Sequence, residues 1–247
     1  MAISTPSQDL AALRGHPSYV WRAGQERRFN LVQRFVPLAG KRILDIGCGV
    51  GMYVRRFRQC SDDVHGVDVE VDRVKQGALS LPNLAAAVGE HLPYRDASLD
   101  VVFLHEVLEH VDNDAETMAE ANRVLRPGGH IVIYVPNRLY FFETHGFYLR
   151  KRFVFRLLPF INWFPDPIRR IFVPHVRAYR YGDLARLFRP LGLRQVTHGY
   201  VYPGFDNVVA RHKILGRVIR AACHMAENTP LRTFGLSHFL VLQKPPA

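Results

Sequence analysis

Two glutamates and a histidine in the segment 105–111 have the types and spacing to carry chemistry. Glu106, Glu109 and His110 occupy positions i, i+3 and i+4, which share one face of an α-helix. Two carboxylates and an imidazole so placed can hold a hard divalent cation such as Mg²⁺. His110 can instead serve as a general base. In a third interpretation the acids only favour the positive end of the helix dipole and the histidine packs.

A glycine-rich loop upstream is the second feature with chemical content. Residues 43–46 are apolar apart from Asp45 and predict a buried parallel strand that ends beside a carboxylate. Gly47, Gly49 and Gly51 follow, and glycines let the backbone turn sharply and lie against a ligand. An ordinary strand-to-helix turn without a ligand is the simpler alternative.

The dinucleotide fingerprint G-x-G-x-x-G is the nearest ligand-binding competitor for this loop. Met52 stands where that fingerprint needs its third glycine. Asp45 would repel a pyrophosphate, but it suits a cationic ligand that carries an amino group. Asp68 ends a second apolar run, 23 residues after Asp45. This is near the spacing of about 20 for an acid that accepts hydrogen bonds from ribose hydroxyls, although a solvated surface aspartate is the alternative.

Strands and helices are predicted to alternate through the first half of the chain. The loop 89–94 precedes an apolar run at 98–104, the expected fourth strand. A Pro-Gly-Gly sequence at 127–129 ends a predicted helix and leads into a fifth strand at 130–135. The last two strands are predicted at 193–200 and 238–242. This pattern predicts an α/β fold with a doubly wound, mostly parallel sheet.

These ordered segments resemble the motifs of class I S-adenosylmethionine (SAM)-dependent methyltransferases, over residues 40–136. The resemblance implies a Rossmann-like sheet of seven strands with an antiparallel last strand, and SAM as the cofactor. Val88 departs from the family, whose members often carry an aspartate there that contacts the adenine. The positions that match the motifs give the expected SAM-binding residues: Asp45, Gly47, Cys48, Gly49, Gly51, Asp68, Val69, Gly89, Glu90, His91, Leu104 and His105.

The string at 106–111, Glu-Val-Leu-Glu-His-Val, resembles the same place in ubiquinone-biosynthesis O-methyltransferases. A similar Glu-x-x-Glu-His occurs in small-RNA 2′-O-methyltransferases. In both groups these residues are associated with a divalent metal near the acceptor hydroxyl. The resemblance implies metal ligands at Glu106, Glu109, His110 and His175, with His145 as the second choice for the last position. In the absence of a metal, His110, His145 and His175 are the candidates for a general base.

The segment after the fifth strand has an unusual composition. Residues 140–164 contain ten aromatic side chains, and residues 138–189 contain eleven Lys/Arg against three acids. Their balance of +8 is most of the chain's net charge of +11. Such an insert can line a pocket for an apolar or aromatic acceptor, rest on an anionic membrane surface, or bind nucleic acid. A lid with its own core and a solvated basic face is the remaining alternative.

Four parts are expected along the chain. Residues 1–39 form an N-terminal helical cover, 40–136 the SAM-binding core, 137–180 a helical cap, and 181–247 the C-terminal completion of the sheet. A helix at 17–38 should lie over the cofactor cleft. Its expected apolar anchors are Tyr19, Trp21, Phe29 and Phe35.

Composition limits the class of protein. A chain of 247 residues with 48% apolar residues predicts one domain with a sizeable core. No apolar run approaches the ~18 residues of a membrane span, and the N-terminus lacks the pattern of a signal peptide. Cys48, Cys60 and Cys223 are too few and too scattered for a disulfide framework or a zinc site. A cytoplasmic location is therefore expected, with peripheral membrane contact as an extension.

The acceptor chemistry follows from the cofactor. A phenol, with a pKa of about 10, gains from a base or a metal that favours its oxyanion. The His and Glu cluster therefore favours methylation of a hydroxyl on a small aromatic or lipophilic molecule. An RNA methyltransferase, a membrane-surface lipid or quinone methyltransferase, and a non-enzymatic SAM-fold protein are the alternatives.

Overall fold

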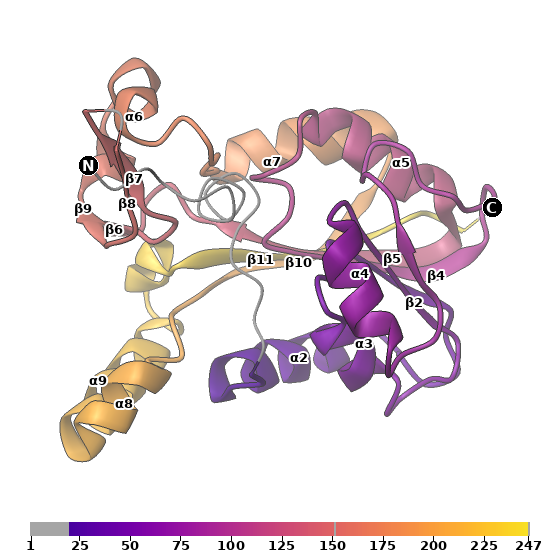
Figure 1. Ribbon diagram of the computed structural model, residues 1–247, viewed down its shortest axis with the longest axis horizontal. Coiled ribbons are helices and arrows are strands. Elements are labelled where there is room, and N and C mark those ends of the chain that lie inside the picture. Colours follow the sequence, from indigo (N-terminus) through magenta and orange to yellow (C-terminus); the bar gives the residue numbers. More distant parts are fainter. Residues whose placement is uncertain (1–19, 151, 247) are drawn as a thin grey trace.

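A computed structural model describes residues 20–150 and 152–246, and a seven-stranded sheet forms its centre (Figure 1). The strand order is β10-β11-β5-β4-β1-β2-β3. The strands are β1 (Ile43–Ile46), β2 (Val64–Asp68), β3 (Leu84–Ala86), β4 (Leu99–His105), β5 (Leu125–Pro136), β10 (Arg194–Val201) and β11 (Ser237–Gln243).

The pairing of the strands confirms the predicted doubly wound, mostly parallel sheet. β1 pairs in parallel with both β2 and β4, so that Ile43 stands opposite Val64 on one side and Val101 on the other. β11 is antiparallel to β5 and to β10. Because β1 is central and covered on both faces, all four of its residues are buried.

Two helical layers cover the sheet. On one face α5 (Asp114–Val124) and α7 (Tyr181–Phe188) contribute Met118 and Leu184 to the core. On the other face α2 (Ala23–Phe35) and α3 (Met52–Phe57) contribute Phe29 and Phe57. The remaining elements of the core are α4 (Val71–Ala78) and the short 3₁₀ helix η2 (Arg189–Leu191).

The N-terminal helix α2 is shorter than the predicted span of 17–38. Phe29 is fully buried, and the ring of Trp21 lies edge-on to that of Tyr53, with 4.9 Å between their centroids. Phe35 is the exception among the expected anchors, because it is 36% exposed and its ring contacts Phe239 and the guanidinium of Arg34. Tyr19 lies outside the described residues.

The insert after β5 contains more strand than the expected helical cap. Its elements are β6 (Phe142–Glu143) paired with β9 (Leu158–Pro159), β7 (Phe147–Leu149) paired with β8 (Arg152–Val154), η1 (Ile161–Trp163) and α6 (Asp166–Phe172). Aromatic side chains favour strands. Gly146, with a φ of 83°, separates β6 from β7. The cap has its own small core of Ile161, Val173 and Val176.

A helical hairpin follows β10. It consists of α8 (Asp206–Arg211) and α9 (Lys213–Ala226), and η3 (Pro230–Phe234) leads from it into β11. The hairpin projects from the end of the molecule that also carries the cap (Figure 1). No helix in residues 20–150 or 152–246 has the length and apolar character to cross a membrane.

Candidate functional site

A cavity of about 410 Å³ lies at the carboxyl ends of β1, β2 and β4. Open α/β sheets bind ligands at this edge, where the chain connections diverge to both sides, and the volume suits a small molecule. Eight of the twelve residues expected to bind SAM line it: Asp45, Gly47, Gly49, Asp68, Val69, Gly89, Glu90 and His105. The other four, Cys48, Gly51, His91 and Leu104, are not among its lining residues.

The glycine loop between β1 and α3 forms one wall of the cavity. Gly47 has a φ of 71°, in the left-handed region that disfavours a side chain. A Cβ atom on Gly47 would also lie 2.4 Å from Cγ2 of Val107. Both the backbone conformation and the contact with Val107 therefore require glycine at this position.

Asp68 connects the glycine loop to the end of β2. Its Oδ2 accepts a hydrogen bond from the backbone N–H of Gly49 at 2.7 Å, and its Oδ1 accepts one from Glu70 at 2.8 Å. The carboxylate therefore holds the loop in place at the cavity wall. Its contact with a ribose stays a prediction.

Asp45 gives the cavity a buried acidic group. Burial raises the pKa of its carboxyl group well above the usual range, and the negative charge of Asp68 raises it further. A cationic ligand beside these two acids would favour the ionised form of Asp45. This electrostatic setting agrees with the expectation that the loop receives a positively charged molecule.

Several residues that line the cavity were not among the expected SAM-binding residues. They are Gln25, Ile46, Val50, Met52, Tyr53, Arg73, Ala87, Val88, Glu106, Val107, His110, Val111, Asp112 and His145. Among them, Gln25 comes from α2, the helix expected over the cofactor cleft, and Tyr53 comes from α3, which directly follows the glycine loop. Val88 stands where members of the family often carry the aspartate that contacts the adenine, so the resemblance could place it; for Ala87, its position just before the Gly89 loop is the one signal.

The helix predicted to begin near Glu106 begins instead at Asp114. Residues 106–112 form bends and turns, and Glu106 has a left-handed backbone with a φ of 55°. Asn113 caps α5, since its Oδ1 accepts hydrogen bonds from the N–H groups of Ala115 and Glu116. Because asparagine at this position starts a helix, the expected helical face of Glu106, Glu109 and His110 does not form.

Glu106 instead faces α2 and β11. Its Oε1 lies 3.4 Å from Nη1 of Arg28 and accepts a hydrogen bond from Oγ of Ser237 at 2.8 Å. Burial by itself would raise the pKa of Glu106, but the charge of Arg28 lowers that pKa to about 2. Glu106 is therefore an anion paired with Arg28.

Glu109, His110 and His145 come together beside the cavity. One ligand atom from each lies within 4.8 Å of those of the other two. Glu109 is buried, and neither of its carboxylate oxygens has a hydrogen-bond partner among the described residues. Burial raises the pKa of Glu109 well above its usual range, and the charge of Glu106 adds to this rise.

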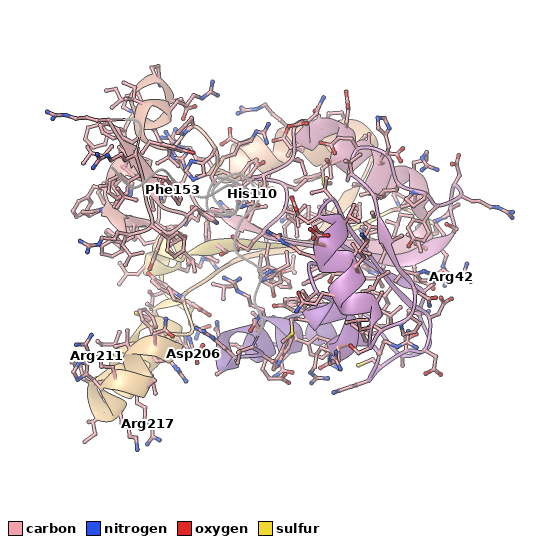
Figure 2. All side chains as sticks on the ribbon, viewed as in Figure 1. Arg42, His110, Phe153, Asp206, Arg211 and Arg217 are labelled. Carbon is pink, nitrogen blue, oxygen red and sulfur yellow. The ribbon has the colours of Figure 1, made fainter. Side chains whose placement is uncertain are left out.

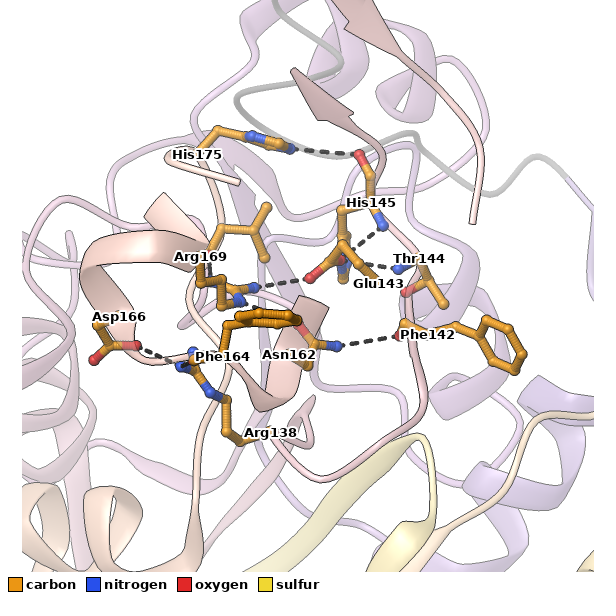
Figure 3. A network of polar contacts seen from close by, with 11 residues as sticks. Arg138, Phe142, Glu143, Thr144, His145, Asn162, Phe164, Asp166, Arg169 and His175 are labelled. Atoms are coloured by element: carbon orange, nitrogen blue, oxygen red, sulfur yellow. Dashed lines mark hydrogen bonds and ion pairs between the residues drawn. The ribbon is translucent and has the colours of Figure 1, made fainter. Parts of the chain in front are cut away.

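A buried polar network in the cap fixes His145 (Figure 3). Nδ1 of His145 lies 2.9 Å from Oε1 of Glu143, which also accepts hydrogen bonds from the N–H groups of Thr144 and His145. Nη2 of Arg169 donates to the other oxygen of Glu143 at 2.8 Å, and Nε of Arg169 donates to Oδ1 of Asn162 at 3.0 Å. A carboxylate only accepts, so Nδ1 carries a proton and Nε2 is the ring nitrogen left for the site.

The network also changes the proton affinity of His145. Burial would lower the pKa of the imidazole, but the hydrogen bond and charge of Glu143 outweigh burial and raise that pKa. Conversely, burial would raise the pKa of Glu143, and His145 and then Arg169 lower it to about 2. The pair is therefore favoured as an imidazolium and a carboxylate.

His175, the first choice for the further ligand, lies outside this cluster. Its Nε2 is 3.4 Å from the carbonyl oxygen of His145 (Figure 3). Its ring packs edge-on against those of Tyr148 and Phe153. It lines a second cavity, of about 740 Å³, which Glu109 and His110 also line. The structure thus brings His145 to the cluster in place of His175, because the β7–β8 hairpin covers the His175 ring.

Known proteins are similar to this chain in sequence and in fold. The profile of a family described as "Methyltransferase domain" matches residues 44–133. A ubiquinone biosynthesis O-methyltransferase from Aromatoleum aromaticum is 30% identical over 180 residues, which cover 67% of this chain and 69% of that protein. A second protein of that name, from Ralstonia nicotianae, is 32% identical over 42% of this chain and 47% of its own length.

A solved structure is similar to nearly the whole chain. It is an S-adenosylmethionine-dependent methyltransferase from Mesorhizobium loti, with a TM-score of 0.62 over 90% of this chain and 98% of that one. The sequence identity is 15%, so this likeness concerns the fold.

Proposed function

Because the chain belongs to the class I SAM-dependent methyltransferases, we propose that it methylates a hydroxyl oxygen of a small aromatic or lipophilic acceptor. One observation carries the proposal. The cavity formed by the glycine loop, Asp45 and Asp68 is also lined by His110 and His145. A cofactor site and groups able to handle a hydroxyl proton therefore share one cavity.

The residues around the cavity suit SAM. The Gly47 loop lets a ligand lie against the backbone, the acid at Asp68 suits a ribose, and Asp45 suits a cationic amino acid moiety. Bound SAM supplies an electrophilic methyl group on a cationic sulfur. Because the transfer is an in-line displacement, holding the acceptor oxygen in line with the methyl group provides much of the rate.

His110 and His145 divide the work on the acceptor hydroxyl. The raised pKa of His145 favours its protonated form, which can donate a hydrogen bond to the acceptor oxygen and stabilise developing negative charge. His110 lines the same cavity and accepts the hydroxyl proton as general base. Glu143 acts through His145, by orienting its ring and favouring its charge.

A divalent cation is the alternative to a protonated His145 in the same group of residues, because a metal binds only the neutral imidazole. Glu109, His110 and His145 would hold it, and the unpartnered buried oxygens of Glu109 are the observation that supports this fit. Such a cation would favour the oxyanion of the acceptor. Glu106 is less suited to the role than the sequence implied, because it pairs with Arg28.

The cap supports a lipophilic acceptor. It contributes His145 to the cavity and exposes large apolar side chains, among them Phe155, Leu157, Phe160 and Ile171. The name of the Aromatoleum relative, a ubiquinone biosynthesis O-methyltransferase, points to the same class of acceptor. An acceptor at a membrane surface is compatible with both observations. RNA is the second candidate, favoured by the net charge of +11, and binding that weakens steeply with salt would distinguish it.

The test is methyl transfer from labelled SAM to a panel of catechols and phenols with short isoprenoid chains. We expect transfer to a phenolic oxygen and a loss of at least tenfold in kcat for Glu109→Ala and His110→Ala, with unchanged affinity for S-adenosylhomocysteine. His130→Ala, on β5 and outside the cavity lining, is the histidine control. Full turnover in the Glu109 and His110 variants would remove the cluster from the chemistry.

A further inference from the structure

The α8–α9 hairpin presents apolar side chains to solvent instead of to the core. In α9, Ile214 is 82% exposed, Leu215 58%, Val218 60% and Met225 66%. Only Gly216 is buried in this helix. Scattered exposed apolar residues are ordinary, but four on one projecting helix form a patch of the kind that marks a binding surface.

The hairpin is a packed unit despite this exposure. α8 and α9 lie so close that a Cβ atom on Gly216 would be 2.6 Å from Cα of Val209. At its base, Asp206 pairs with Arg220 at 3.0 Å, and Glu227 pairs with Arg27 of α2. The apolar patch therefore belongs to an ordered helix pair that is fixed to the core.

Basic side chains surround the apolar patch. Arg211, Lys213 and Arg217 are exposed, and no ion pair joins them to an acid within residues 20–150 and 152–246. The two acids of the hairpin region, Asp206 and Glu227, are those already paired at its base. Figure 2 shows Arg211 and Arg217 on the outer part of the hairpin, and Asp206 near its base.

We infer that the α8–α9 hairpin binds an anionic lipid surface. A helix that places aliphatic side chains at the acyl boundary and Lys/Arg at the headgroups is the arrangement of interfacial membrane helices. A second copy of the chain does not complement this surface, because the same positive patch would meet itself. Nucleic acid would satisfy the positive charges but would leave the aliphatic face of Ile214, Leu215 and Val218 exposed to water.

The position of the hairpin gives the contact a purpose. The hairpin and the cap lie at the same end of the molecule (Figure 1). Phe141 in the cap stacks on Phe234 in η3, with 5.1 Å between the ring centroids, and this contact connects the two regions. A membrane at this end would bring a lipophilic acceptor to the cap. This purpose rests on the proposed function, whereas binding to vesicles does not depend on catalysis.

The experiment is sedimentation of the full chain with phosphatidylcholine vesicles, with and without phosphatidylglycerol. We expect binding only when phosphatidylglycerol is present. Each basic residue near such a surface strengthens partitioning about fivefold, so the triple variant Arg211→Gln, Lys213→Gln, Arg217→Gln should bind about 100-fold more weakly. Ile214→Ser with Val218→Ser should also reduce binding. The matched control, Arg34→Gln, Lys75→Gln, Arg95→Gln, removes three exposed charges elsewhere and should keep more than a third of the affinity.

Equal losses in the hairpin and control variants would overturn the inference, because total charge would then explain the binding. Unchanged binding in both hairpin variants would overturn it as well. A dimer that the Ile214 and Val218 substitutions dissociate, seen by light scattering, would assign the face to a second copy. Turnover of a water-soluble phenol without vesicles tests the proposed function separately. If the protein binds vesicles but does not methylate the phenol, the proposed function fails and the membrane role of the hairpin stands.

Discussion

Replacing Glu143 by Gln should destabilise the cap and change the titration of His145 together. Glutamine keeps the shape of Glu143 but removes the charge that meets His145 and Arg169. Arg169 would keep its hydrogen bonds to Asn162 and to the carbonyl of Val176, so the guanidinium would stay buried without a counterion. Breaking one side of such a buried pair is strongly destabilising.

The magnitude follows from the pKa of Glu143. That pKa falls from an ordinary 4.5 to about 2 on folding, which corresponds to about 3 kcal/mol of folding free energy at neutral pH. A lowered pKa stabilises the folded state above pH 4.5, and the contribution disappears as the pH falls toward 2. The variant should therefore lose about 3 kcal/mol at pH 7 and much less at pH 3.

The imidazole titrates in the opposite sense. In the wild type Glu143 raises the pKa of His145 above 6.5, so this contribution to stability is complete below pH 6.5 and is lost as the pH rises through the raised value. In Glu143→Gln burial dominates, and the pKa of His145 should fall below 6.5.

Urea denaturation at pH 7 and pH 3, with NMR titration of the histidine ring protons, measures both effects, and the exposed Glu116→Gln is the matched control. The reasoning is refuted if Glu143→Gln unfolds at the same urea concentration as the wild type at pH 7, or if His145 titrates unchanged.

Three further predictions concern the cavity. Gly47→Ala should reduce the affinity for S-adenosylhomocysteine at least tenfold, because the added methyl group would collide with Val107. The control Gly40→Ala, at a φ of 65° with open space around it, should cost only about 1 kcal/mol of stability. Equal affinities of the two variants for S-adenosylhomocysteine, measured by calorimetry, would contradict the account. Asp68→Asn should weaken that binding roughly tenfold through loss of a charge-assisted hydrogen bond to the loop, whereas the exposed Asp72→Asn should not, and a normal affinity for the Asp68 variant would exclude this role. Removal of divalent cations with EDTA should lower turnover, with recovery on addition of Mg²⁺ and no change in cofactor affinity; turnover that is insensitive to EDTA would leave His110 as the base without a metal.

The sheet and the cofactor loop could be predicted because their signals are local. Apolar runs of four to seven residues give β1, β2 and β4, and glycine spacing with Asp45 gives the loop between β1 and α3. The carboxyl ends of adjacent parallel strands meet at one edge, so Asp45 and Asp68 had to lie near each other.

The cluster of Glu109, His110 and His145 could not be predicted from helical spacing, because two features other than a helix position these residues. Asn113 starts α5 eight residues later than expected, which leaves Glu109 and His110 in a turn. His145 reaches them because Glu143 pairs with Arg169, 26 residues further along the chain. Neither of these contacts has a periodic signature, and the sequence favoured His175 over His145 as the further ligand.

The cap shows the same limit. Its aromatic and basic composition indicated an insert with a separate role, yet the helical expectation was wrong for most of it. The β6–β9 and β7–β8 pairs depend on contacts between short segments, whose strand preference is weak without a partner.

The central claim is that one cavity holds SAM and places the acceptor oxygen beside His110 and His145. A crystal structure of the chain with S-adenosylhomocysteine tests it most directly. The account predicts the ribose at Asp68, the amino acid moiety near Asp45, and the sulfur facing the two histidines. Binding of S-adenosylhomocysteine elsewhere on the chain, or with its sulfur directed away from His110 and His145, would contradict the account.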